Sequence, residues 1–266
     1  MFRIGNIPYN FGISKTTLGG IKIIYSNKNY RLSTEFSELS IHDKKRDLQF
    51  PNKLTPLLAE EIGIHYGDGF LSNKKNDFRV KGHKYDEREY YDGHIKKLYK
   101  ELYNLNLPLK EFSDVYGFEI YSQGLKQFKT KVLGIQAGPK GSIKFPEILK
   151  INDVSILTSF LRGLFDTDGS IIFKDRKCRK YFYPIISISI KSPYLKKEVI
   201  NILKMLGLKP ISYKNVAKDG IRYGVYLNGY ERFFKYMKLV GFNSPKHLKK
   251  VEKWKELHPD FAKSLK

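Results

Sequence analysis

"FLRGLFDTDGSIIF", residues 160–173, is the stretch that most directly predicts the fold of this chain. Apolar residues recur at helical spacing before and within it: Leu157, Phe160, Leu161 and Leu164. Gly169 ends the predicted helix. Asp166 and Asp168 therefore stand at the buried end of an apolar helix, where carboxylates are uncommon. A second stretch, "LLAEEIGIHYGDGFL" at residues 57–71, ends in the same Asp-Gly pair.

The sequence indicates an internal duplication. Three landmarks occur twice in the same order: Asp68-Gly69 and Asp168-Gly169, Pro108 and Pro210, and Pro139-Lys140 and Pro245-Lys246. Their offsets are 100, 102 and 106 residues. We therefore predict an N-terminal extension at residues 1–52, a first repeat at 53–150 and a second repeat at 151–266.

Each repeat is predicted to have the element order αββαββα. In the second repeat, strands are expected in "SIIF" and "YFYPIISISIK", a helix after Ser192-Pro193 that ends at Gly207, strands in "ISYKNV" and "IRYGVYLNG", and a helix from Phe233 to Val240. The first repeat fits the same order less cleanly. The predicted fold class is α+β: two pseudo-symmetric repeats form a saddle of two antiparallel sheets, with the two motif helices packed at the centre.

The formal net charge is +22, and residues 151–266 alone hold 24 basic and 10 acidic residues. Such an excess indicates a polyanionic partner, most often nucleic acid, although a lysine-rich solvated surface is the simpler alternative. The 19 tyrosines among the lysines favour nucleic acid. Residues on the outward sheet faces and the adjoining turns are the predicted DNA contacts: Lys74, Lys75, Arg79, Lys81, His83, Lys174, Arg176, Lys177, Arg179, Lys180, Ser187, Ser189, Lys214 and Arg222.

Small residues four apart line one face of each motif helix. They are Gly63 and Gly67 in the first repeat, and Gly163 and Thr167 in the second. If these faces pack together, Asp68 and Asp168 emerge side by side. Two close carboxylates repel unless a cation lies between them, and Mg²⁺ suits both the oxygen ligands and phosphodiester chemistry. A single Asp-Gly pair would more simply be a helix end followed by a turn.

These residues resemble a known family. "LRGLFDTDG" (161–169) is similar to the signature of the LAGLIDADG homing endonucleases, and "EIGIHYGDG" (61–69) resembles it more loosely. The first motif departs from the family pattern, with Tyr66 where an acid is usual and Glu61 where an apolar residue is usual. The resemblance covers roughly residues 53 to 255, and the duplication resembles the single-chain form of the family.

The resemblance implies a monomeric endonuclease that binds a long, nearly non-palindromic site on double-stranded DNA in the major groove and cuts both strands. Asp68 and Asp168 would hold Mg²⁺, or another divalent ion such as Mn²⁺, with the backbone carbonyls of Gly67 and Thr167. The family also places a basic residue near each cleavage centre. Lys140 and Lys246 are the best matches, with Lys191 and His83 as further candidates at the ends of the second strands.

Two alternatives stay open at this point: an RNA maturase that helps an intron fold, and a DNA-binding regulator that does not cleave. Two facing carboxylates favour the nuclease, because a binder has no need of them. The single Cys178 excludes an internal disulfide and a multi-cysteine zinc site. With no run of 18 apolar residues and no signal-peptide pattern, we expect no membrane association and an intracellular location, with an organelle-encoded origin left open.

Overall fold

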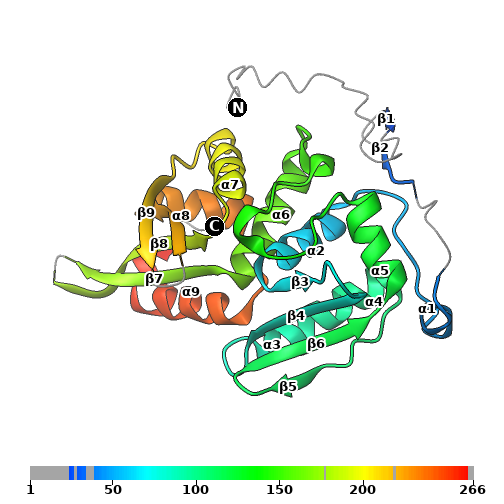
Figure 1. The fold of residues 1–266 in the computed structure, drawn as a ribbon. Coiled ribbons are helices and arrows are strands. Elements are labelled where there is room, and N and C mark those ends of the chain that lie inside the picture. The colour runs from blue at the N-terminus through cyan, green and yellow to red at the C-terminus, as the bar shows by residue number, and fades with distance from the viewer. Residues whose placement is uncertain (1–23, 27–28, 34–38, 177, 218–219, 263–266) are drawn as a thin grey trace.

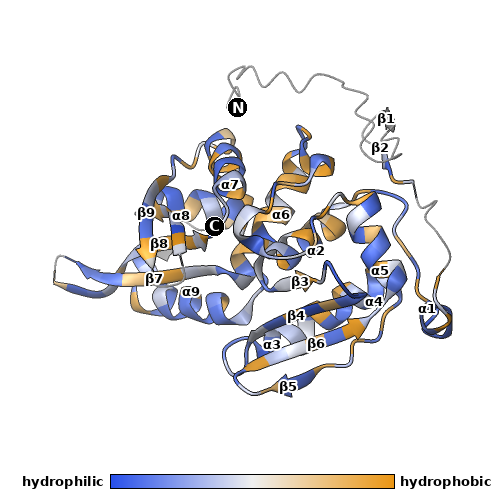
Figure 2. Cartoon of the chain, viewed as in Figure 1, coloured by the Kyte–Doolittle hydropathy of each residue, from blue (hydrophilic) through white to orange (hydrophobic). Residues whose placement is uncertain are grey.

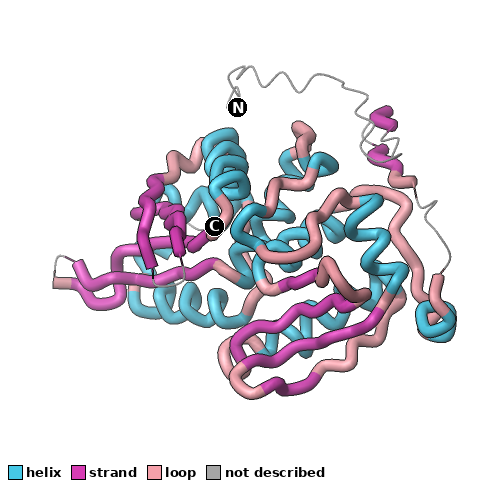
Figure 3. Tube along the Cα trace, viewed as in Figure 1, coloured by secondary structure: helices cyan, strands magenta, loops and turns pink. Residues whose placement is uncertain are grey.

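The computed structural model describes residues 24–26, 29–33, 39–176, 178–217 and 220–262. Two four-stranded antiparallel sheets lie on either side of a central pair of helices, α2 and α6, and each sheet is backed by further helices (Figure 1). Helices and strands thus form separate layers in both halves of the molecule (Figure 3). The predicted α+β fold with two repeats is confirmed.

The elements follow one plan twice. The N-terminal part has β1 (Ile24–Ser26), β2 (Asn29–Arg31) and α1 (Ile41–Lys45). The first sheet and its helices comprise α2 (Pro56–Gly67), β3 (Gly69–Leu71), β4 (Asp77–His83), α3 (Arg88–Tyr90), η1 (Tyr91–Ile95), α4 (Lys96–Tyr103), β5 (Lys110–Phe112), β6 (Val115–Tyr121), α5 (Gln123–Gln127) and η2 (Phe128–Val132), followed by the connecting turns η3 (Lys140–Ser142) and η4 (Glu147–Leu149). The second comprises α6 (Val154–Thr167), β7 (Gly169–Arg176), β8 (Arg179–Ile190), α7 (Pro193–Met205), β9 (Ile211–Ala217), β10 (Gly220–Asn228), α8 (Tyr230–Leu239), α9 (Pro245–Leu257) and α10 (Pro259–Ala262).

The two central helices have well-defined ends and almost no exposed face. The Thr55 side chain caps α2 by accepting from the backbone N–H of Leu58, and Asp153 caps α6 by accepting from that of Ser155. Nearly every residue of both helices is buried, which is the pattern of helices at the centre of a fold.

Glycines allow α2 and α6 to cross with their backbones in contact. A Cβ added to Gly63 would lie 2.1 Å from the carbonyl oxygen of Phe160, and one added to Gly163 would lie 2.1 Å from that of Glu60. Neither position has room for a side chain. The predicted packing of the small-residue faces is therefore what the structure shows, and it brings the C-terminal ends of the two helices together.

The strands after each helix have equivalent registers. Gly69 pairs with Val80 in the first sheet, and Gly169 pairs with Ile188 in the second. Alternate residues of β8 point inward as predicted, with Ile186, Ile188 and Ile190 buried, while Ser187 and Ser189 lie on the outward face. The β7–β8 hairpin extends away from the body of the molecule, and its far end is hydrophilic (Figures 1 and 2).

Two features of the fold differ from the expectation. A further helix, α9, follows the second repeat's αββαββα order, and its buried Trp254 donates from Nε1 to the carbonyl of Phe182 at 3.1 Å. In the first repeat, the middle helix begins at Arg88 and contains a π-helical turn before α4. The two sheets have equivalent strand orders, β3-β4-β6-β5 and β7-β8-β10-β9.

Candidate active site and DNA-binding face

Asp68 and Asp168 lie at equivalent positions, each as the residue that ends a central helix. Asp68 is half-buried and accepts a hydrogen bond from the Tyr91 hydroxyl at 2.8 Å, whereas Asp168 is open to solvent. The crossing of α2 and α6 brings the two carboxylates close enough that the charge of Asp168 raises the pKa of Asp68.

The pKa values of both aspartates are raised, by burial and by neighbouring negative charge. Desolvation raises the pKa of Asp68 well above its usual value, and the charges of Glu87 and Asp168 raise it further. The pKa of Asp168 is also raised, by desolvation and then by Glu87, while Lys140 opposes the shift. Because Asp168 is the more exposed of the two, we expect its shift to be the smaller. Both pKa values are therefore raised by burial first and by crowded negative charge second.

A lysine lies at each helix end. Lys140 donates from Nζ to the carbonyl oxygen of Gly67, and Lys246 donates to that of Thr167 at 3.1 Å. Burial lowers the pKa of Lys140, and the two aspartates oppose the shift. The structure thus brings together Asp68, Asp168, Gly67, Thr167, Lys140 and Lys246, all of which were predicted as site residues.

The segments that carry these lysines are anchored by the motif helices themselves. The Tyr66 hydroxyl donates to the carbonyl of Lys144 at 2.7 Å, four residues after Lys140. Asp166 accepts from the backbone N–H groups of Asn243 and Ser244, each at 3.0 Å, just before Lys246. The fully buried carboxylate of Asp166 therefore holds the start of α9.

Glu87 is a site residue that the sequence analysis missed. Its carboxylate forms an ion pair with Lys246 and accepts from the backbone N–H of His83 at 2.5 Å. Gly82 makes room for it: a Cβ there would lie 2.0 Å from Oε2 of Glu87 and 2.8 Å from Oδ2 of Asp68. No sequence signal marked Glu87, because its partner lies 159 residues away in the other repeat.

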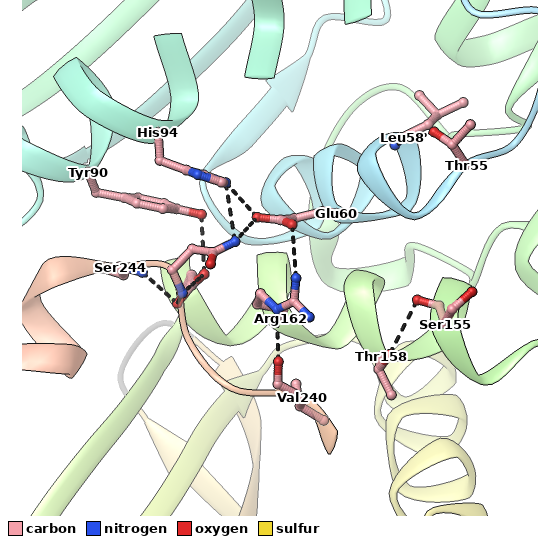
Figure 4. Close-up of polar contacts among 12 residues, drawn as sticks. Thr55, Leu58, Glu60, Tyr90, His94, Ser155, Thr158, Arg162, Val240 and Ser244 are labelled. Carbon is pink, nitrogen blue, oxygen red and sulfur yellow. Dashed lines mark hydrogen bonds and ion pairs between the residues drawn. The ribbon is translucent and has the colours of Figure 1, made fainter. Parts of the chain in front are cut away.

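A polar network joins the repeats beside the site (Figure 4). The buried Glu60 of α2 contacts Nε2 of His94 at 2.6 Å and accepts from Nδ2 of Asn243 at 2.7 Å. Arg162 of α6 contacts Glu60 at 3.5 Å and donates from Nε to the carbonyl of Val240 at 2.8 Å. These contacts fix the segment before Lys246 against the first repeat.

The two further candidates at the strand ends lie at matching positions. His83 ends β4 and Lys191 directly follows β8; both side chains are exposed. The imidazole of His83 pairs with Asp86 at 3.2 Å, so it is the His83 backbone that contacts Glu87. Arg222, predicted as a DNA contact, lies near enough to Asp168 to lower its pKa. The roles of His83, Lys191 and Arg222 stay predictions.

The other predicted DNA contacts lie on strands or on the turns between them, and several are held by neighbours. Lys81 pairs with Glu119 at 2.7 Å, and Arg79 lies over the Phe70 ring. Arg176 stacks on Tyr183 near the far end of the β7–β8 hairpin. The exposed members are Lys74, Lys75, Lys174, Arg179, Lys180, Ser189 and Lys214, and Ser187 is half-buried. Lys177 lies outside the described residues.

The helix ends provide a suitable donor set for a divalent cation. The donors are two carboxylates with raised pKa and two carbonyls at helix C-termini, where the helix dipole is negative. The ammonium groups of Lys140 and Lys246 already contact these carbonyls, as a cation would. Within the described ranges, no group of three or more His, Cys, Asp and Glu side chains is arranged to hold a metal ion.

Comparison with known proteins identifies the fold. The family described as "LAGLIDADG-like domain" matches residues 155–244, which run from α6 to the residue before α9. The second repeat is similar to this family over these residues. The fold is also that of the homing endonuclease I-DmoI in complex with DNA and Ca, with a TM-score of 0.51 and 16% identity over 75% of this chain and 98% of that one. The resemblance inferred from the two motifs is confirmed.

The chain also has one weaker structural similarity and one sequence similarity. Full-length DUF199/WhiA from Thermatoga maritima aligns with a TM-score of 0.47 and 15% identity, covering 82% of this chain and 64% of that chain. A glutamine–fructose-6-phosphate aminotransferase of Methanocaldococcus jannaschii is 26% identical over 212 residues, 77% of this chain. The chain spans 18% of the length of that aminotransferase. None of the described helices is both long and apolar enough to cross a membrane.

Proposed function

We propose that this LAGLIDADG protein is a site-specific endonuclease that hydrolyses both strands of double-stranded DNA with a divalent cation. The observation that carries the proposal is the pseudo-symmetric site itself, in which each central helix ends in an aspartate and a lysine contacts the carbonyl just before it. Two equivalent centres would each cut one strand, and the duplicated helix ends support a proposal of two such centres.

The proposed chemistry assigns a role to each group. Asp68 and Asp168, with the carbonyls of Gly67 and Thr167, would hold Mg²⁺ or Mn²⁺. The bound ion supplies activation of water and neutralisation of the phosphate charge. Lys140 and Lys246 would stabilise charge on the scissile phosphates. Cleavage would leave 3′-hydroxyl and 5′-phosphate ends. The lysines contact the same carbonyls, and each carbonyl oxygen has a second lone pair that a cation could use.

DNA binding is proposed to use the outward faces of both sheets. These faces carry basic and hydroxyl side chains beside exposed aromatic rings such as Tyr213, which is 56% exposed. Lysine and arginine neutralise phosphates, and strand side chains of this kind fit the major groove. The site that is cut would be long, because the two sheets lie on opposite sides of the central helices (Figure 1).

The test is a cleavage screen on plasmids that carry DNA from around the gene's insertion point, with Mg²⁺ and with a chelator. We expect a linear product that the chelator prevents. Asp168→Asn should lower the cleavage rate at least about 100-fold while leaving DNA affinity unchanged or higher, because it removes a metal ligand and one negative charge. Asp114→Asn, in the exposed β5–β6 turn, is the matched control and should cut normally.

The outcomes of this test distinguish the endonuclease from a DNA-binding regulator and from a maturase. Equal cutting by the Asp168→Asn variant would show that the helix ends are not the active site. Tight DNA binding with no nicking under any divalent cation would favour a DNA-binding regulator, and selective binding of a structured intron RNA would favour a maturase.

A further inference from the structure

The middle helix of each repeat begins with a residue that reaches into the lysine segment of the other repeat. Glu87 is the N-cap of α3 and pairs with Lys246. Ser192 is the N-cap of α7, and its hydroxyl donates to the carbonyl of Ile143 at 2.6 Å, three residues after Lys140. The two contacts are related by the internal pseudo-symmetry.

The chemistry of these two contacts differs. Ser192 is neutral and contacts only the backbone near Lys140, so Lys140 itself is placed by burial and by the Gly67 carbonyl. Glu87 is a carboxylate and contacts the ammonium group of Lys246 directly. Lys246 therefore lies between a charged partner in the first repeat and the Thr167 carbonyl in the second.

We propose that Glu87 is a positioning residue that holds Lys246 at one of the two cleavage centres and thereby makes the two strand cuts unequal. The unequal strand cuts rest on the proposed endonuclease function. The contact between Glu87 and Lys246 does not depend on that function. Lysine has four rotatable bonds, and fixing its ammonium in advance reduces the entropy lost when the phosphate arrives.

Glu87 is itself firmly placed. Its side chain is buried, the His83 backbone N–H donates to it, and the absence of a side chain at Gly82 leaves the space that it occupies. A carboxylate fixed in this way restricts the conformation of a flexible lysine more than an exposed glutamate would. Glu89 shows the contrast: it pairs with Lys249 between the same two helices, α3 and α9, but both side chains are exposed.

The first experiment measures each strand separately. A supercoiled plasmid carrying the site cut in the screen is labelled differently on its two strands and incubated with wild type, Glu87→Gln and Glu89→Gln. We expect Glu87→Gln to slow one strand about 10-fold and to accumulate nicked circles, with the other strand within about 2-fold of wild type. Glu89→Gln should cut both strands normally. Equal slowing of both strands, or no slowing, would overturn the proposal.

The double variant tests whether Glu87 acts through Lys246. In a Lys246→Met background, Glu87→Gln should have no further effect on the slow strand, because the residue that it positions is gone. Independent, multiplied losses would contradict a positioning role. Glu87→Asp keeps the charge and should recover part of the rate on the affected strand, whereas a purely structural loss would not be recovered in one strand alone.

A second readout needs no DNA. Acetylation with a succinimidyl ester, followed by mass spectrometry, reports how accessible each lysine is. Lys246 should react several-fold faster in Glu87→Gln than in wild type, with Lys140 unchanged, and Glu89→Gln should not alter Lys246. Unchanged reactivity of Lys246 would overturn the inference even if the protein cleaves DNA. Faster reaction in a protein that cuts no DNA would uphold the contact and reject the proposed endonuclease.

Discussion

The two repeats place the same groups at the helix ends but hold them by different chemistry. Tyr66 and Asp166 occupy equivalent positions, yet one donates a hydroxyl to a carbonyl and the other accepts from backbone N–H groups. At the position equivalent to Leu161, the first repeat has Glu61. The two repeats therefore share the geometry of the helix ends, although different residues hold that geometry in place.

The outward faces also differ in charge balance. In the first sheet and its flanking turn, Glu119 pairs with Lys81, and Glu111 pairs with both Lys84 and Arg88. The second repeat holds 24 basic residues against 10 acidic ones, compared with 17 and 13 in residues 51–150. We therefore expect the second sheet to contribute more of the salt-dependent DNA affinity.

The largest stability difference between the repeats should lie at Glu61. Its carboxylate is fully buried, pairs with Lys129 at 2.5 Å and accepts from the hydroxyls of Tyr99 and Tyr103. Lys129→Met should lower the free energy of unfolding by about 3 to 5 kcal/mol, because it leaves a buried charge without its partner. Urea denaturation measures this loss.

The double variant Glu61→Leu with Lys129→Met serves as the control, and its leucine is the residue that the second repeat has at this position. It should recover most of the loss, with a remainder of about 1 kcal/mol for each tyrosine hydroxyl that loses its acceptor. A double variant as unstable as Lys129→Met alone would show that the ion pair is not the cause.

The next largest effect is a pH dependence of stability that Asp166 should show and Tyr66 should not. Burial raises the pKa of Asp166 to about 7, whereas the unfolded chain has a value near 3.8. The folded protein therefore keeps a proton that the unfolded chain releases between about pH 4 and 7, so this group lowers stability as pH rises through that window. The substituted asparagine does not titrate, so the free energy of unfolding of Asp166→Asn relative to wild type should rise by a few kcal/mol across the same window. The expected change is about 1.4 kcal/mol per pKa unit.

Tyr66→Phe is the matched change in the first repeat. Burial raises the pKa of Tyr66, so its hydroxyl is neutral throughout this pH range. The variant should lose about 1 kcal/mol of stability for the missing hydrogen bond, independently of pH. Urea unfolding at several pH values checks both variants, and parallel pH profiles for Asp166→Asn and wild type would contradict the assignment.

The sequence predicted those parts of the molecule that depend on local pattern. Helix periodicity, Asp-Gly ends and strand alternation gave the repeats, the central crossing and the pairing of Asp68 with Asp168. The resemblance to the family predicted a basic residue near each helix end, and the repeat relation between Lys140 and Lys246 selected these two, which the structure places there. The α9 helix was missed although Ser244-Pro245 is the same starting signal as Ser192-Pro193.

The remaining features depend on contacts between residues far apart in the chain. Glu87 reaches Lys246, Glu60 reaches Asn243 and Glu61 reaches Lys129, and none of these glutamates belongs to a periodic pattern. A buried acid in a single sequence indicates that a partner exists, but it does not say which residue the fold will bring to it.

The crossing of α2 and α6 is the feature that the two repeats have in common, and a glycine substitution tests it. Gly163→Ala should lower stability by about 1 to 3 kcal/mol, because the new Cβ would meet the Glu60 carbonyl at 2.1 Å and the helix backbones would have to separate. Gly93→Ala in η1 is the control: a Cβ there meets nothing within 4 Å, so the substitution should stabilise by about 0.5 to 1 kcal/mol. Equal responses in urea denaturation would mean that the glycines at the crossing are not required for close packing, and cleavage by Gly163→Ala should fall with stability because the same crossing sets the separation of Asp68 from Asp168.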